Sequence, residues 1–270
     1  MKSKNVVTLL CLLALIIAVL TVSALKNSDI KGSAQKNETF SALSQQSDTS
    51  QIPSYAASSL NATSNENRNP SSSADNVFVS MTDSLFIGDS RTVGLMEYAE
   101  ISNADFFCNV GMSVYNIDKK TVSVPNVGKV TLTELLTHKK YGKIYIMLGV
   151  NEVGYQINKT VSKYSGLIDL IRQSQPDAVV FIQANLHVTK QRSEGDKVVN
   201  NSAIDKLNTQ LKTLADGKSV FYLDANTVFD DGSGNLPSDK SEDGTHLYAK
   251  YYAEWGRWII NQTSLLAGKG

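Results

Sequence analysis

Cysteine and histidine are scarce in this chain of 270 residues, which holds two cysteines and three histidines. Cys11 lies in an apolar amino-terminal run and Cys108 in a predicted strand, so neither a disulfide nor a metal site is expected from them. Both are interpreted as buried apolar residues. The three histidines, His138, His187 and His246, leave few assignments for any mechanism that depends on an imidazole.

Net charge is lacking as well. The chain carries 26 lysines and arginines against 26 aspartates and glutamates, so its formal net charge at pH 7 is zero. Overall charge therefore gives no support to a nucleic acid or an acidic polymer as a partner.

A long apolar run occurs at the amino terminus, where Lys2 and Lys4 precede the stretch from Val6 to Leu25. This pattern is typical of a membrane-targeting segment. About 20 residues at roughly 1.5 Å rise match a bilayer core of about 30 Å, so we expect residues 1–25 to be a signal anchor with the following chain outside the membrane. The alternative is a cleaved signal peptide and a secreted protein, because Val22-Ser23-Ala24 is an acceptable cleavage site.

Residues 26–76 are dominated by Ser, Asn, Gln, Thr and Ala and show almost no apolar periodicity. This composition predicts a disordered linker. A flexible coil of about 50 residues has a root-mean-square reach of roughly 40 Å, enough to hold a folded domain away from a membrane surface.

Residues 77–270 alternate short apolar runs with amphipathic segments, and their length of about 190 residues suits one domain. Strands that alternate with helices imply right-handed crossovers and a parallel sheet covered on both faces. The expected strands are 84–87, 105–110, 143–148, 179–183 and 220–223. The expected helices are 132–138, 161–174, 204–215, one that starts near Ser90, and an amphipathic closing helix after His246.

Residues that could carry chemistry follow the expected strands, at the edge where open parallel sheets bind ligands. In Gly88-Asp89-Ser90-Arg91 a serine stands at the start of a helix, where it can be exposed and where a developing anion is favoured. A helix cap explains Ser90 or Asp89 equally well at this stage.

Two candidate hydrogen-bond donors follow other expected strands, and a carboxylate and a histidine stand just before the closing helix. Gly111 can turn its amide toward a ligand, and Asn151 offers a side-chain amide or makes an Asx turn. In Asp243-Gly244-Thr245-His246 a carboxylate stands three residues before a histidine. It can hydrogen-bond the imidazole, fix its tautomer and stabilise its protonated form, although a histidine at such a place is often structural.

Together and in this order, these segments resemble the SGNH/GDSL hydrolase superfamily over most of the stretch from Ser84 to Tyr252. The resemblance implies a flavodoxin-like three-layer α/β/α sandwich with a five-stranded parallel sheet. It also implies ester hydrolysis or acyl transfer without a metal or other cofactor. The matching blocks are Gly88-Asp89-Ser90 for the nucleophile, Gly111 for the glycine, Gly149-Val150-Asn151 for the asparagine, and Asp243-Gly244-Thr245-His246 for the Asp-x-x-His motif.

The resemblance implies a role for each matching residue. Ser90 would be the nucleophile, His246 the general base and Asp243 the acid that orients His246. The backbone amides of Ser90 and Gly111, with the Asn151 side chain, would form the oxyanion hole.

Two positions depart from the family pattern: Arg91, where leucine is frequent, and Glu152, where aspartate often follows the asparagine. Arg91 is a candidate contact for an anionic part of the substrate, or a surface residue at a helix start. His187, after the fourth expected strand, is a candidate substrate contact or a structural residue. Asp224, after the fifth, is an alternative to Asp243 as the triad acid.

Expected export and this residue set predict an extracytoplasmic esterase that removes an acyl group, first of all acetyl, from cell-wall or extracellular carbohydrate. The same site could instead transfer an acyl group between sugars or hydrolyse a lipid ester. A non-catalytic domain that binds glycans is the alternative from a different class.

Overall fold

Continuous apolar runs of four or five residues form the central sheet, because strands covered on both faces must be apolar on both. The computed structural model describes residues 79–267. The predicted signal anchor, residues 1–25, the linker, residues 26–76, and Cys11 all lie outside the described residues. No helix within residues 79–267 has the length and apolar character needed to cross a bilayer.

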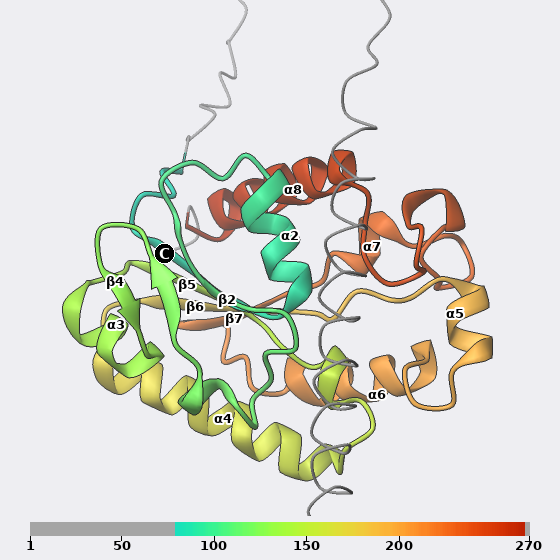
Figure 1. Cartoon of the computed structure of the whole chain (residues 1–270), viewed down its shortest axis with the longest axis horizontal. Coiled ribbons are helices and arrows are strands. Elements are labelled where there is room, and N and C mark those ends of the chain that lie inside the picture. The colour runs from blue at the N-terminus through green and yellow to red at the C-terminus, as the bar shows by residue number, and fades with distance from the viewer. Residues whose placement is uncertain (1–78, 268–270) are drawn as a thin grey trace, which may run out of the picture. The chain divides into compact units, whose positions relative to one another are not determined.

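The sheet has five strands in the order β2-β1-β5-β6-β7, and each neighbouring pair is parallel. All five expected strands are present, with ends that differ by no more than a residue or two. The expected three-layer α/β/α sandwich is confirmed (Figure 1). The strands are β1 (Ser84–Gly88), β2 (Asp105–Cys108), β5 (Lys143–Met147), β6 (Val179–Gln183) and β7 (Val220–Leu223).

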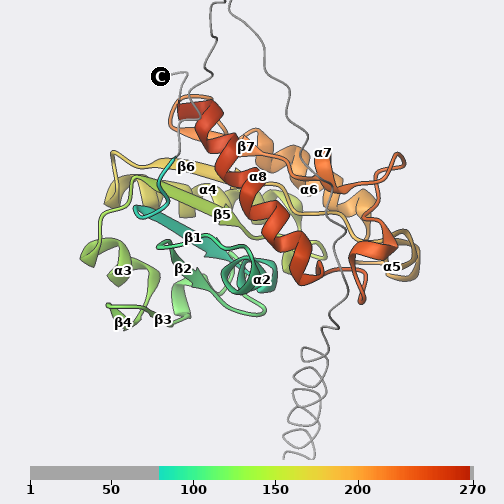
Figure 2. The ribbon, with the colours of Figure 1, turned by 90° about the horizontal axis from the view of Figure 1, so that it is seen from above.

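Helices cover both faces of this sheet (Figure 2). Each face has its own apolar core. One face carries α3 (Leu132–His138), α4 (Ile157–Ser174) and α6 (Asn201–Lys212). The other carries α2 (Ser90–Tyr98), α7 (Asn226–Phe229) and α8 (Ala249–Ala267). The sequence pattern missed α7, α5 (Lys190–Gly195), the hairpin of β3 (Val122–Val124) and β4 (Gly128–Val130), and three 3-10 turns, Ile117–Lys119, Val150–Glu152 and Ser238–Lys240.

A row of aromatic rings crosses the sheet on the face of α2 and α8, one ring from each strand. Phe86 stacks on Phe106 and on Tyr145, with ring centroids 5.0 and 4.4 Å apart. The row continues from Tyr145 to Phe181 at 4.8 Å and from Phe181 to Phe221 at 5.8 Å. The strand register pairs the same residues, so the stacking helps to fix the order and alignment of all five strands.

Helices α2 and α8 approach closely because a glycine lies at their contact. A Cβ placed on Gly94 of α2 would lie 2.2 Å from the ring of Tyr252 in α8, so no other residue fits without displacing that ring. Since α2 begins at Ser90 and α8 closely follows His246, this contact joins two parts of the chain that are distant in sequence.

We expect Gly94→Ala to lower the free energy of unfolding by about 1–3 kcal/mol, because the added methyl overpacks the contact with Tyr252. The matched control is Gly166→Ala on the exposed side of α4, where an added Cβ has nothing within 4 Å. There the better helix propensity of alanine should raise stability by up to about 1 kcal/mol. Urea unfolding measures both, and a stabilised Gly94→Ala protein would contradict the close contact.

Candidate active site

Ser90 is the first residue of α2 and follows β1 directly. Gly88 ends the strand, and a Cβ there would lie 1.9 Å from Oγ1 of Thr92, so the turn into the helix is tight. Asp89 is the helix cap, because its carboxylate accepts the N–H of Arg91 at 3.0 Å. The capping role therefore falls to Asp89, and the Ser90 hydroxyl is available for other contacts.

A continuous hydrogen-bonded relay joins Ser90, His246 and Asp243. The Ser90 Oγ lies 2.8 Å from Nε2 of His246, and Nδ1 of His246 lies 2.6 Å from Oδ2 of Asp243. With a proton on Nδ1 donated to the carboxylate, Nε2 is free to accept the proton of the serine hydroxyl. The fold thus brings together the three side chains that the sequence motifs single out.

The turn that carries Asp243 and His246 is held by its own backbone and by neighbouring segments. Oδ1 of Asp243 accepts the N–H groups of Thr245 and His246, each at 2.8 Å. Burial acts to raise the pKa of Asp243, but the bonds from His246 and Thr245 lower it to about 2, so the carboxylate is ionised at neutral pH. Gly244 has φ +75° and its carbonyl accepts the N–H of Thr189 at 2.9 Å, which fastens the turn to the segment after β6.

Asp224 does not reach this relay. Its Oδ1 accepts both the backbone N–H and the side-chain amide of Asn226, at 3.1 and 3.0 Å, at the start of α7. The alternative in which Asp224 orients His246 is therefore wrong, because Asp243 occupies the Nδ1 side of that ring.

Arg91 points into the protein. It is only 1% exposed, and its guanidinium donates to the carbonyl oxygens of Leu186 at 2.8 Å and Thr245 at 3.2 Å. The interpretation of Arg91 as a substrate contact is wrong for this geometry, since a substrate cannot reach it from solvent. Arg91 instead ties the residue before His246 to the segment after β6.

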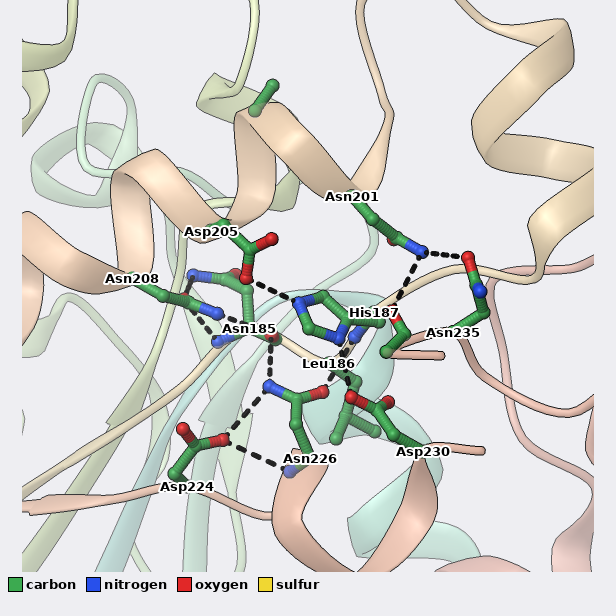
Figure 3. A network of polar contacts seen from close by, with 12 residues as sticks. Asn185, Leu186, His187, Asn201, Asp205, Asn208, Asp224, Asn226, Asp230 and Asn235 are labelled. Atoms are coloured by element: carbon green, nitrogen blue, oxygen red, sulfur yellow. Dashed lines mark hydrogen bonds and ion pairs between the residues drawn. The ribbon is translucent and has the colours of Figure 1, made fainter. Parts of the chain in front are cut away.

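His187 lies between two carboxylates (Figure 3). Its Nδ1 is 2.7 Å from Oδ2 of Asp230, and its Nε2 is 2.9 Å from Oδ1 of Asp205. Burial acts to lower the pKa of His187, but the two carboxylates outweigh it and raise that pKa above its usual value. Only 8% of the residue is exposed, and its backbone N–H donates to Asn226. His187 is therefore structural, and the interpretation as a substrate contact is wrong.

The candidate oxyanion donors lie at the carboxyl edge of the sheet. Gly111 is exposed, with φ +71° and open space on its Cβ side. Asn151 is exposed, and its amide donates one bond to the Met112 carbonyl at 3.0 Å. Within residues 79–267, the backbone N–H groups of Ser90 and Gly111 have no acceptor. Because β2 and β5 lie on either side of β1, the segments that carry Gly111 and Asn151 flank the turn into α2, where the Ser90 amide is the third candidate donor.

Thr189 was missed from sequence, and the burial of Glu152 was not foreseen. Thr189 caps α5 through its side chain, which accepts the N–H of Arg192 at 3.3 Å, and a threonine before a polar helical segment was the available signal. Glu152 is 1% exposed, and the only hint of this was its departure from the usual aspartate.

A polar hollow of about 430 Å³ borders the catalytic-acid candidate, between α5 and the segment before α8. Most of its lining residues are polar, and Ser90 and His246 are not among them. The lining residues include Gln191, Arg192, Ser238, Ser241, Glu242 and Asp243.

Comparisons with known proteins identify a matching family model and similar folds. The family model described as GDSL-like lipase/acylhydrolase matches residues 86–253. None of the curated proteins compared with the chain matches it. Solved structures between 14% and 20% identical to the chain show that the fold is shared.

Several solved structures share this fold with TM-scores above 0.5, and three of them are described below. A proposed platelet activating factor from Streptococcus pneumoniae is 20% identical, with a TM-score of 0.54, and the match covers 69% of this chain and 86% of that one. A GDSL-like lipase from Bacteroides thetaiotaomicron is 15% identical, covering 68% and 91%, with a TM-score of 0.51. A family two carbohydrate esterase from Clostridium thermocellum, in complex with cellohexaose, is 14% identical, covering 68% and 64%, with a TM-score of 0.51.

The His187 network predicts a pH-dependent stability. Because the folded-state pKa of His187 is raised, its contribution is complete below the pKa of the unfolded state and is lost as pH rises through the folded-state value. Asp205→Asn, at a side chain that is 62% exposed, should lower the pKa of His187 and move this loss to lower pH. Urea unfolding across pH, with NMR titration of the three histidines, measures both, and an unchanged His187 titration in Asp205→Asn would contradict the network.

Proposed function

The chain belongs to the GDSL-like lipase/acylhydrolase family and is an ester-bond hydrolase, and we propose that it is an extracytoplasmic serine esterase that removes acyl groups, foremost acetyl, from cell-wall or extracellular carbohydrate. The observation that carries the catalytic part is the relay from Ser90 through His246 to Asp243, at 2.8 and 2.6 Å. Membership in this family sets aside the alternative of a non-catalytic glycan-binding domain.

In the proposed acylation step, Ser90 Oγ attacks the carbonyl carbon of the ester while Nε2 of His246 takes the hydroxyl proton. Asp243, ionised at neutral pH, stabilises the imidazolium that forms. The negative carbonyl oxygen lies among the amides of Ser90 and Gly111 and the side chain of Asn151. The intermediate then collapses as the bond between its carbonyl carbon and the sugar oxygen breaks. His246 gives its proton to that oxygen, so the sugar leaves as an alcohol and the acyl group stays on Ser90 Oγ.

Deacylation repeats these steps with water. His246 takes a proton from the water as its oxygen attacks the acyl carbonyl, and the same donors hold the second tetrahedral intermediate. When that intermediate collapses, Ser90 Oγ leaves and regains its proton from His246. The products are the free acid and the unmodified enzyme, and a sugar hydroxyl in place of water would give acyl transfer instead.

Three considerations support a carbohydrate ester outside the cell. The hollow beside Asp243 is lined mainly by polar residues, which favours a ligand rich in hydroxyl groups. One protein with a similar fold is a family two carbohydrate esterase in complex with cellohexaose, which favours a carbohydrate substrate. The apolar amino-terminal segment, residues 6–25, supports export and attachment to the membrane.

Ser90→Ala should reduce hydrolysis of an activated acetyl ester by about 10³-fold or more, because the acyl-enzyme cannot form. Covalent labelling by a fluorophosphonate should be lost in parallel. Equal rates for Ser90→Ala and wild type would contradict the proposed mechanism.

Product analysis with acetylated glycan then separates free acetate, as proposed, from an acetylated acceptor, while release of fatty acid from a lipid ester would favour a lipid hydrolase.

Asn151→Ala should lower kcat by roughly 10²–10³-fold, about 3 kcal/mol of transition-state stabilisation, with a smaller change in KM. The matched control is Asn261→Ala, an exposed asparagine in the distal half of α8, which should leave kcat unchanged. Steady-state kinetics on the same ester measure both variants. If the two variants behaved alike, Asn151 would not be an oxyanion donor.

A further inference from the structure

Glu152 lies next to a candidate oxyanion donor but has no part in the proton relay. It is 1% exposed, and its Oε1 accepts the backbone N–H of Val114 at 2.7 Å. Its Oε2 is buried and has no hydrogen-bond partner in the described part of the chain. A buried oxygen without a partner costs stability, so this side chain calls for an explanation beyond packing.

Two adjacent side chains join the loop after β5 to the loop after β2. Asn151 donates to the carbonyl of Met112, and Glu152 accepts from the N–H of Val114. These two bonds fix the backbone just after Gly111, at the carbonyl of Met112 and the N–H of Val114. The Gly111 amide and the Asn151 amide are therefore carried by loops that are fastened to each other beside the serine.

The charge of Glu152 also matters at this place. Burial and, less strongly, the charge of Asp89 raise the pKa of Glu152 to about 7, although the backbone N–H groups of Val114, Gly149 and Glu152 itself act to lower it. The titratable groups that face it are Asp89, from the turn between β1 and α2, and Tyr164, from α4. A neutral Glu152 still accepts the Val114 bond and adds no negative charge beside a developing oxyanion.

We propose that Glu152 is a positioning residue that holds the Gly111 loop against the Asn151 loop, and that its uncharged form supports the faster reaction. This inference rests on the proposed function, because it takes the two loops to carry oxyanion donors. Glu152 itself touches neither the substrate nor the reacting atoms.

The test compares full-length wild type, Glu152→Gln and Glu152→Met on an activated acetyl ester. Glutamine keeps an acceptor for the Val114 N–H, so kcat should stay within about threefold of wild type at pH 6. Methionine has a similar volume but no such acceptor, so kcat should fall by about 10-fold or more with KM within about twofold, as expected when donors are misplaced.

The pH dependence of kcat gives a second test, because a purely structural role of Glu152 would not change it. Glutamine cannot ionise, so the ratio of kcat for Glu152→Gln to kcat for wild type should rise as pH passes about 7. The two proteins differ only at residue 152, so the ratio reports the effect of that side chain. The Val114 backbone amide, followed by NMR in the full-length chain, should titrate over the same range in wild type and stay constant in Glu152→Gln.

Each outcome separates this inference from the broader proposal. A Glu152→Met protein with wild-type kcat, or a ratio that stays flat across pH, overturns the positioning role while Ser90-dependent turnover still supports the esterase. Wild-type turnover that does not depend on Ser90 overturns the proposed function and this inference with it. If Glu152→Met does not fold, the isosteric Glu152→Gln protein and the Val114 titration decide the question.

Discussion

The contact between α2 and α8 at Gly94 is the constraint on which the arrangement of the site depends. Ser90 starts one of these helices, and His246 precedes the other by three residues. A separation of 156 residues along the chain becomes 2.8 Å between Oγ and Nε2 because the two helices pack side by side on one face of the sheet. The missing side chain of Gly94 sets how near they come, so a packing detail in the helix interior controls a distance between polar groups at its start.

Two buried charged side chains, Arg91 and His187, position the backbone segments around the relay without taking part in it. Arg91 fastens the carbonyls of Leu186 and Thr245, so it spans the segment after β6 and the turn that bears His246. His187 follows Leu186 directly and fixes the same segment to the carboxylates of Asp205 and Asp230 (Figure 3). Burying such charges is costly unless each finds partners, which is why the partners here are carbonyls and carboxylates in short contact.

The sequence was sufficient to predict the five strands and the polar segments at their ends, because strands buried on both faces are continuous apolar runs. It missed the β3–β4 hairpin and α7, whose elements of three or four residues are too short to show a period. The roles of Arg91 and His187 were mistaken for a different reason. A sequence shows that a residue is cationic, but only the fold shows which acceptors surround it and whether solvent reaches it.

The described chain enters and leaves the domain on the side opposite the relay. Val79 leads into the amino end of β1, and α8 runs from beside His246 to Ala267, roughly 27 Å away at the usual helical rise (Figures 1 and 2). Both attachment points are therefore remote from the carboxyl edge of the sheet. A solid support attached at Val79 or at Ala267 would therefore lie on the side away from the relay, with the carboxyl edge of the sheet facing the medium.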